Sequence, residues 1–65
     1  MNQLKMYRVF KCYELLQNKS RNIYTIARYL NVSERTVYRY FKLFENLGFI
    51  VIKEKYNKYK LIKKL

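Results

Sequence analysis

Apolar residues in the middle of the chain repeat at helical spacing and are interrupted by one short polar break. Asn31 tolerates the left-handed backbone that ends a helix, and Ser33 is a good N-cap for the helix that follows. The pattern therefore predicts a helix over about 23–30, a tight turn, and a second helix over about 34–47. The apolar stripe of the first of these helices consists of Ile23, Ile26, Ala27 and Leu30.

The helix expected over 34–47 separates apolar and basic side chains onto opposite faces. Its apolar face is expected to be buried and consists of Val37, Phe41, Phe44 and Leu47. The residues that follow an i, i+3, i+4, i+7 spacing on the other side are Arg35, Tyr38, Arg39 and Lys42. We expect this helix to pack on its neighbour and to turn a row of hydrogen-bond donors toward solvent.

The flanking segments predict one more helix and a pair of strands. Residues 3–17 form a candidate first helix, with Met6, Val9, Phe10, Tyr13 and Leu16 on one face and Cys12 as a small core residue. Asn22 is a plausible cap for the helix over 23–30. Gly48 suits the left-handed position that ends a helix, and a β-hairpin is expected over 49–63, with Asn57 at positive φ in its turn. Pro is absent and Gly occurs once, so residues 1–65 are interpreted as one domain.

The run Val32-Ser33-Glu34-Arg35-Thr36-Val37, followed by Leu47-Gly48, resembles the winged helix-turn-helix domain of bacterial and archaeal regulators. The nearest types are the deoxyribose repressor and the N-terminal domain of the biotin repressor. This resemblance implies an α+β fold, a three-helix bundle with a C-terminal two-stranded β-hairpin wing. It also implies that the wing lies along a minor groove or the backbone. Asn31 stands where the family often has Gly, and Tyr38-Arg39-Tyr40 where it often has Arg-Arg-Asp, so base preference is not carried over.

Composition restricts the class of function. Fifteen Lys and Arg residues against four acidic residues give a net charge of +11, which predicts a polyanionic partner, double-stranded DNA. A single Cys, no His and few carboxylates argue against a disulfide framework, a metal site and acid–base catalysis. We therefore expect a binding protein that is not an enzyme and has no cofactor and no small-molecule effector. With neither a spanning apolar run nor a secretory signal, we expect a cytoplasmic protein that does not enter a membrane.

Candidate DNA contacts follow from this arrangement. The base-contacting candidates are Arg35, Tyr38, Arg39 and Lys42, because an arginine can donate two hydrogen bonds to guanine. The backbone-contacting candidates are Tyr24, Thr25, Ser33, Thr36, Lys53, Lys55, Tyr56, Lys58 and Lys60. Lys63 and Lys64 add charge to the hairpin, and Tyr59 is expected to anchor it to the core. A basic helix face is often only a solvated face, but the exposed helix together with the wing lysines favours binding.

Two functions remain open at this point. The first hypothesis is a small regulator of transcription that acts as a homodimer, since one recognition helix covers few base pairs. The apolar residues that the core does not obviously use, and that could form the dimer surface, are Leu4, Tyr7, Tyr40 and Leu43. The alternative is an architectural, recombination or replication accessory protein of a phage or plasmid. A reader of left-handed DNA or a protein-contact domain is less well supported, because the chain has neither Pro nor Trp.

Overall fold

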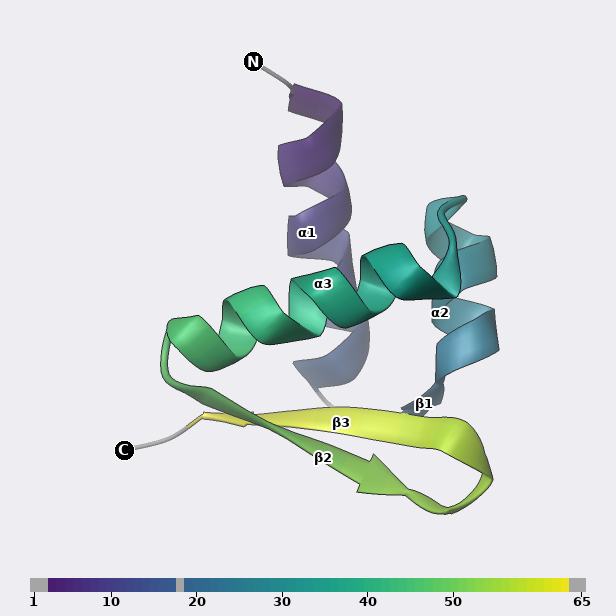
Figure 1. The fold of residues 1–65 in the computed structure, drawn as a ribbon, viewed down its shortest axis with the longest axis vertical. Helices are drawn as coiled ribbons and strands as arrows, with labels where there is room; N and C mark the ends of the chain where they lie inside the picture. Colours follow the sequence, from purple (N-terminus) through teal and green to yellow (C-terminus); the bar gives the residue numbers. More distant parts are fainter. Residues whose placement is uncertain (1–2, 18, 64–65) are drawn as a thin grey trace.

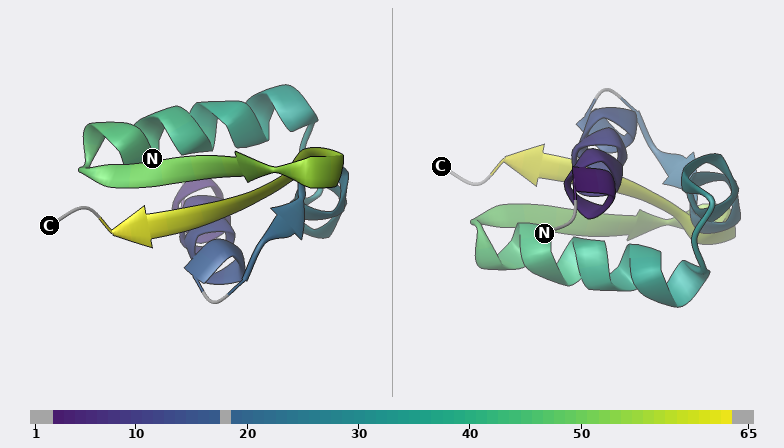
Figure 2. Two further views of the ribbon diagram at one scale, coloured as in Figure 1. Left: turned by 90° about the horizontal axis from the view of Figure 1, so that it is seen from below. Right: turned by 90° about the horizontal axis from the view of Figure 1, so that it is seen from above.

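The computed structural model describes residues 3–17 and 19–63, and it contains helices followed by an antiparallel sheet (Figure 1). The elements in chain order are α1 (Gln3–Gln17), β1 (Arg21–Asn22), α2 (Ile23–Leu30), α3 (Glu34–Asn46), β2 (Phe49–Glu54), the 3-10 turn η1 (Lys55–Asn57) and β3 (Lys58–Lys63). Helix α3 crosses α1, and the hairpin of β2 and β3 runs along α3, as the views in Figure 2 also show. The tip of the hairpin lies at the end of the molecule where α2 begins.

Short polar side chains set the limits of α2 and α3. The Asn22 side chain accepts a hydrogen bond of 2.8 Å from the Tyr24 amide, and the Ser33 hydroxyl accepts one of 3.2 Å from the Thr36 amide. Asn31 has φ 59°, in the left-handed region, and ends α2. These three expectations from the sequence are confirmed. Asn22 fixes the start of α2, and Asn31 and Ser33 fix the turn between α2 and α3.

The sheet has the order β1-β3-β2 and is antiparallel throughout. The expected hairpin is present, with a register that runs from Phe49 opposite Lys63 to Glu54 opposite Lys58. A third, two-residue strand adds to the expected two, because Arg21 and Asn22 pair with β3. A contact with α1, outside the sheet, also holds this strand, because the Arg21 Nε donates a hydrogen bond of 3.0 Å to the carbonyl oxygen of Leu15.

Positive φ angles occur where the chain turns. Gly48 (φ 101°) links α3 to β2, and Asn57 (φ 58°) lies in the hairpin turn, as expected. Tyr56 also has positive φ (61°), which a residue with a large side chain rarely adopts. Its carbonyl oxygen accepts a hydrogen bond of 2.8 Å from Asn22 Nδ2, so the cap of α2 also holds the hairpin tip.

The core lies between the three helices and the inner face of the sheet. Its members are Cys12, Leu16, Ile23, Ile26, Ala27, Leu30, Val37, Tyr40, Phe41, Phe44, Tyr59 and Leu61. The stripe expected on α2 is fully buried, and Tyr59 anchors the hairpin as expected. Two expectations for α3 are wrong. Leu47 is 67% exposed because it is the C-terminal cap, where the chain already turns toward β2, and Tyr40 is buried because it packs on the side of α3 that meets α1.

The buried face of α1 is also rotated from the expected one. Met6 and Phe10 are 69% and 57% exposed, whereas Cys12 and Leu16 are fully buried and Tyr13 is half-buried. The apolar residues of α1 cover more than half a turn, so periodicity alone does not identify the side that meets the core. The expectation for Cys12 as a small core residue is confirmed. Within residues 3–17 and 19–63, no helix is long and apolar enough to span a bilayer.

Candidate nucleic-acid interface

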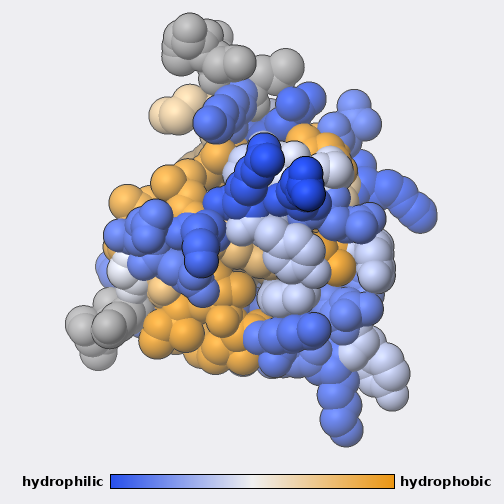
Figure 3. Space-filling view, viewed as in Figure 1, coloured by the Kyte–Doolittle hydropathy of each residue, from blue (hydrophilic) through white to orange (hydrophobic). Residues whose placement is uncertain are grey.

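The basic row of α3 faces away from the core. Arg35, Arg39 and Lys42 are all exposed and lie opposite the buried side chains of the helix, which are Val37, Tyr40, Phe41 and Phe44. In Figure 3 hydrophilic side chains gather over the middle of α3 and again near the hairpin tip, with residues of intermediate hydropathy between the two groups. The three cations therefore form an exposed ridge along the side of α3 that faces away from the core.

Tyr38 differs from the other three members of this row because it is held by the hairpin. Its ring packs edge-on against Phe41 (centroids 5.9 Å apart) and Tyr59 (6.0 Å), and its hydroxyl lies 3.4 Å from the Tyr59 hydroxyl. This hydrogen bond, with partial burial, raises the pKa of Tyr38. Tyr38 is still 46% exposed and offers a fixed hydroxyl beside the basic row.

One part of the hairpin flanks the row on α3. Lys53 pairs with Tyr59 in the register, so its side chain is on the sheet face that meets α3, and its charge opposes the rise in the pKa of Tyr38. Lys55 is exposed at the tip, and Tyr56 beside it is 80% exposed. Because Asn22 is bonded to this tip, the exposed residues Tyr24 and Thr25 at the start of α2 lie at the same end of the domain.

Two lysines of β3 are not brought to this surface. Side chains alternate along a strand, so Lys58 and Lys60 lie on the sheet face opposite to Tyr59. The Nζ of Lys60 lies 3.8 Å from Oε2 of Glu54, and the other carboxylate oxygen of Glu54, Oε1, accepts a hydrogen bond from the Ser20 hydroxyl. Lys63 is exposed at the end of the hairpin far from the tip, and Lys64 is outside the described residues.

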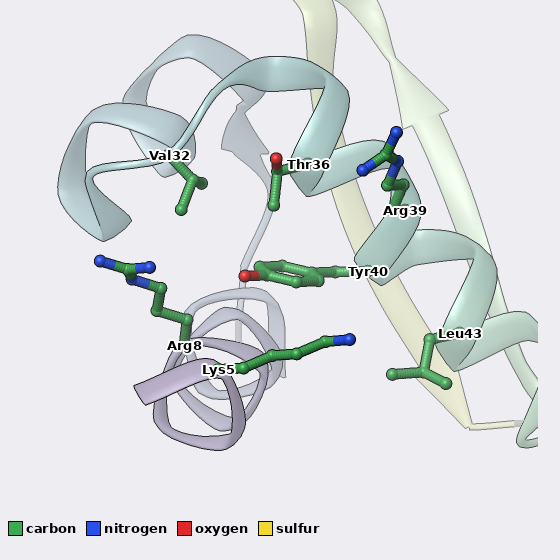
Figure 4. A pocket seen from close by; sticks show the side chains of 7 residues that line it. All are labelled: Lys5, Arg8, Val32, Thr36, Arg39, Tyr40 and Leu43. Atoms are coloured by element: carbon green, nitrogen blue, oxygen red, sulfur yellow. The ribbon is translucent and has the colours of Figure 1, made fainter. Parts of the chain in front are cut away.

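A groove of about 450 Å³ separates α1 from α3 on the other side of the row (Figure 4). Its lining residues are Lys5, Arg8, Val32, Thr36, Arg39, Tyr40 and Leu43. Among the described residues that line it there are three cations and no carboxylate. The Tyr40 ring lies across the groove between α1 and Thr36, and burial raises its pKa while the charge of Arg8 opposes the rise. The groove is therefore a positively charged channel with an apolar floor.

Lys5 and Arg8 were not among the residues expected to bind DNA. They are spaced i, i+3 on α1 and border its buried stripe. They therefore lie at the edge of the contact between α1 and α3. The i, i+3 spacing could have indicated from the sequence that Lys5 and Arg8 share a face of α1. To place that face beside α3, however, one must know which side of α1 meets the core. On the α3 side of the groove, Ser33 and Thr36 share a hydroxyl contact of 3.1 Å at the first turn of the helix.

Three helices followed by an antiparallel hairpin that flanks the third helix define a winged helix domain. The chain belongs to the helix-turn-helix family, because the profile described as "HTH domain" matches residues 8–60. This match includes α2, the turn and α3 and most of the hairpin, and it makes DNA the partner of this fold. The searches of curated proteins and of solved structures returned no match.

Proposed function

We propose that the protein binds double-stranded DNA sequence-specifically, with α3 inserted in the major groove. The observation that supports this most directly is the exposed ridge of Arg35, Arg39 and Lys42 on the helix that follows the turn. The major groove is about 12 Å wide and accepts an α-helix. The ridge faces outward from the domain, so it can enter the groove without any change in the packing of the core.

Base selection is assigned to the side chains of this ridge. An arginine can donate two hydrogen bonds to O6 and N7 of guanine, which discriminates by about 1 to 3 kcal/mol against another base. Arg39 is the central member, with Arg35 one turn before it. Tyr38 is assigned a contact with the edge of the groove, because its ring is fixed against Tyr59.

The flanks of the ridge are assigned to the two DNA strands that border the groove. Lys53 and Lys55 of the hairpin contact one phosphate backbone, and Lys5 and Arg8 of α1 contact the other. In this proposal Lys5 and Arg8 take the place of Lys58 and Lys60 as phosphate contacts, because Lys58 and Lys60 face away from α3. Tyr24, Thr25, Ser33, Thr36 and Tyr56 remain candidates for neutral hydrogen bonds to phosphates.

The biological role that we propose is a small transcriptional regulator that occupies a promoter or operator. An architectural or recombination accessory role uses the same surface, and the two roles differ in the arrangement of their sites. A regulator with two-fold symmetry selects a palindrome, whereas a protein that coats or bends DNA binds repeated sites cooperatively.

The test is selection of bound duplexes from a random pool, followed by the same selection with two variants. We expect the wild type to enrich one short motif, and Arg39→Ala to lose preference at one or two of its positions. The control is Lys53→Ala with Lys55→Ala, which should weaken binding to all sequences equally and leave the motif unchanged.

Failure to enrich any motif, while duplexes still bind, would contradict sequence-specific readout. A motif altered by the Lys53 and Lys55 substitutions but not by Arg39→Ala would mean that the hairpin reads the bases. The spacing and symmetry of the enriched sites distinguish the regulator from the accessory protein.

A further inference from the structure

Three exposed tyrosines come from different elements and lie at one end of the domain. Tyr24 is in the first turn of α2, Tyr38 is in the second turn of α3, and Tyr56 is in the turn between β2 and β3. Their exposed fractions are 52%, 46% and 80%. The start of α2, the start of α3 and the hairpin tip lie at the same end of the domain in Figures 1 and 2. We call these three residues the tip tyrosines.

Contacts with the rest of the domain hold the tip tyrosines in place. Tyr56 has φ 61° and ψ 36°, a left-handed conformation that costs energy for a residue with a large side chain. The side chain of Asn22 donates to the carbonyl oxygen of Tyr56 and accepts from the amide of Tyr24, so one residue connects two of the three. Strained backbone of this kind is concentrated at functional sites, where it directs a side chain. The tip therefore presents the Tyr56 ring to solvent at an energetic cost.

Tyr38 is fixed through its ring, which packs edge-on against Tyr59 and Phe41. Two lysines of the hairpin accompany the tip tyrosines. Lys55 directly precedes Tyr56 and is exposed, and Lys53 lies on the sheet face that meets α3. Exposed rings and cations thus alternate over a small part of the surface.

Two of the four acidic residues also lie toward this end of the domain. Glu34 begins α3, and its charge contributes to the raised pKa of Tyr38. Glu54 ends β2, but its carboxylate is paired with Lys60 on the outer face of the sheet. An anionic ligand is therefore expected on the hairpin side of the tip tyrosines, where the two lysines lie.

We propose that the tip tyrosines form a platform on which unpaired bases of single-stranded DNA stack, while Lys53 and Lys55 contact its phosphates. Bases inside a duplex present only their edges to a protein, whereas an unpaired base also presents its face. Aromatic rings beside cations match the two parts of a single strand, its bases and its phosphates. DNA is assigned because it is the partner of this fold. The inference goes beyond the binding of double-stranded DNA proposed above and does not depend on it.

A dimer contact does not explain why these rings are exposed. Of the residues that the sequence suggested for a dimer surface, Tyr40 is buried in the core and Leu43 lines the basic groove, while the side chain of Leu4 is outside the described part of the chain. Tyr7 of that set is exposed on α1, where its ring centroid lies 5.8 Å from the Nζ of Lys11. None of the tip tyrosines belongs to the set.

Fluorescence anisotropy with two labelled strands of about 12 nucleotides tests the proposal. One strand carries thymine at every position, and the other is abasic, so both have the same phosphates but only the first has bases to stack. We expect the wild type to bind the thymidine strand at least about tenfold more tightly than the abasic strand at the same salt concentration. The ratio of the two affinities removes the general attraction between a chain of charge +11 and any polyanion.

Substitutions of single rings assign this preference to the tip. Tyr56→Ala and Tyr24→Ala should each reduce the ratio at least about threefold and leave affinity for the abasic strand unchanged. Tyr56→Phe keeps the ring and should keep the ratio. Tyr29→Ala is the matched control, because Tyr29 is 62% exposed on α2 but lies beside Leu15 of α1, and it should also keep the ratio. Melting curves confirm that each variant is folded.

Equal affinity of the wild type for the two strands would overturn the proposal. So would a ratio that both Tyr56→Ala and Tyr24→Ala leave unchanged, or one that Tyr29→Ala reduces equally. A uridine strand of the same length that binds more tightly than the thymidine strand would overturn the assignment to DNA. Because no duplex is present, failure here and failure to enrich a duplex motif are separate results.

Discussion

The tyrosines of this chain show how one residue type is divided among different tasks. Tyr40 and Tyr59 are buried in the core, Tyr38 connects α3 to the hairpin, and Tyr56 is exposed at the tip. A tyrosine has an apolar ring and a polar hydroxyl, so it can occupy a core, a boundary or a surface at little cost. For this reason the sequence placed Tyr59 correctly, next to alternating strand residues, but did not identify Tyr40 as a core residue.

Cys12 is a thiol whose chemistry is suppressed by its position. It is fully buried at the centre of α1, and this burial raises its pKa to about 12. The nucleophilic form of cysteine is the thiolate, so the folded protein has roughly 1000-fold less of it than a thiol of ordinary pKa at the same pH. The sequence expectation of a small core residue agrees with this position.

We expect the thiol of Cys12 to be protected in the folded state. Labelling with a disulfide reagent at pH 8 should be at least about 100-fold slower in the native protein than in 6 M guanidinium. The folded pKa lies above the unfolded one, so this group contributes stability that is complete below about pH 9 and is lost as the pH rises toward 12. Cys12→Ala should reduce that alkaline loss. Rapid labelling of the native protein would show instead that the thiol is accessible.

At the scale of elements, the sequence predicts features that depend on neighbouring residues, but not features that depend on contacts between distant parts of the chain. The caps at Asn22 and Ser33 and the left-handed Asn31 depend on a few neighbouring residues, so the sequence was sufficient to locate them. Strand β1 is only two residues long and exists because Arg21 bonds to α1 and β3 lies beside it. No pattern in two residues can indicate such pairing, since its cause is a contact far away along the chain.

The same limit explains the part of the candidate site that the sequence missed. The row on α3 follows from periodicity within one helix. Lys5 and Arg8 belong to the proposed site only because α1 crosses α3 beside the row, and Lys60 is left out of the proposal because its side of β3 faces away from α3. Both results depend on packing between elements. A pattern within one element therefore predicts which residues share a face, but not which element that face meets.

Asn22 connects two elements, and its two functions can be separated by substitution. Its oxygen caps α2 and its amide nitrogen donates to the carbonyl oxygen of Tyr56. Asn22→Ala removes both bonds and should lower the free energy of unfolding by about 1 to 2 kcal/mol. Asn22→Asp keeps the acceptor at the helix N-terminus but loses the donor, so its stability should stay within about 0.5 kcal/mol of the wild type.

The two variants should differ in the hairpin tip as well. Hydrogen exchange at the amide of Lys58 should be faster in both, because both lose the bond to Tyr56. Denaturant unfolding curves together with exchange rates provide the measurement. If Asn22→Asp is as destabilised as Asn22→Ala, the tether to the tip and not the cap is the main contribution of this residue.

At the scale of the whole molecule, charge is distributed in a way that separates two surfaces. The cations of α1, α3 and the hairpin tip are exposed or half-buried, while the hollow lined by Met6, Phe10 and Leu47 next to the end of α3 is apolar. A domain of this size buries only about 60% of the surface of its unfolded chain and has little stability to lose. The proposed DNA contacts lie outside the small core, on α1, α3, β2 and the hairpin tip, so variants at these positions should remain folded.

The salt dependence of binding tests how many phosphates this basic surface contacts. Lys5, Arg8, Lys53 and Lys55, with one member of the α3 row, give about five contacts for each chain, so log K should fall with log salt with a slope of about −4 to −5 on a duplex that holds one chain. Lys53→Ala with Lys55→Ala should reduce the magnitude of the slope by about 2. Lys60→Ala is the matched control, because Lys60 is paired with Glu54 on the opposite sheet face, and it should leave the slope unchanged. A slope near zero would exclude the phosphate contacts, and a loss at Lys60 equal to that of the hairpin pair would mean that the DNA lies against the outer face of the sheet.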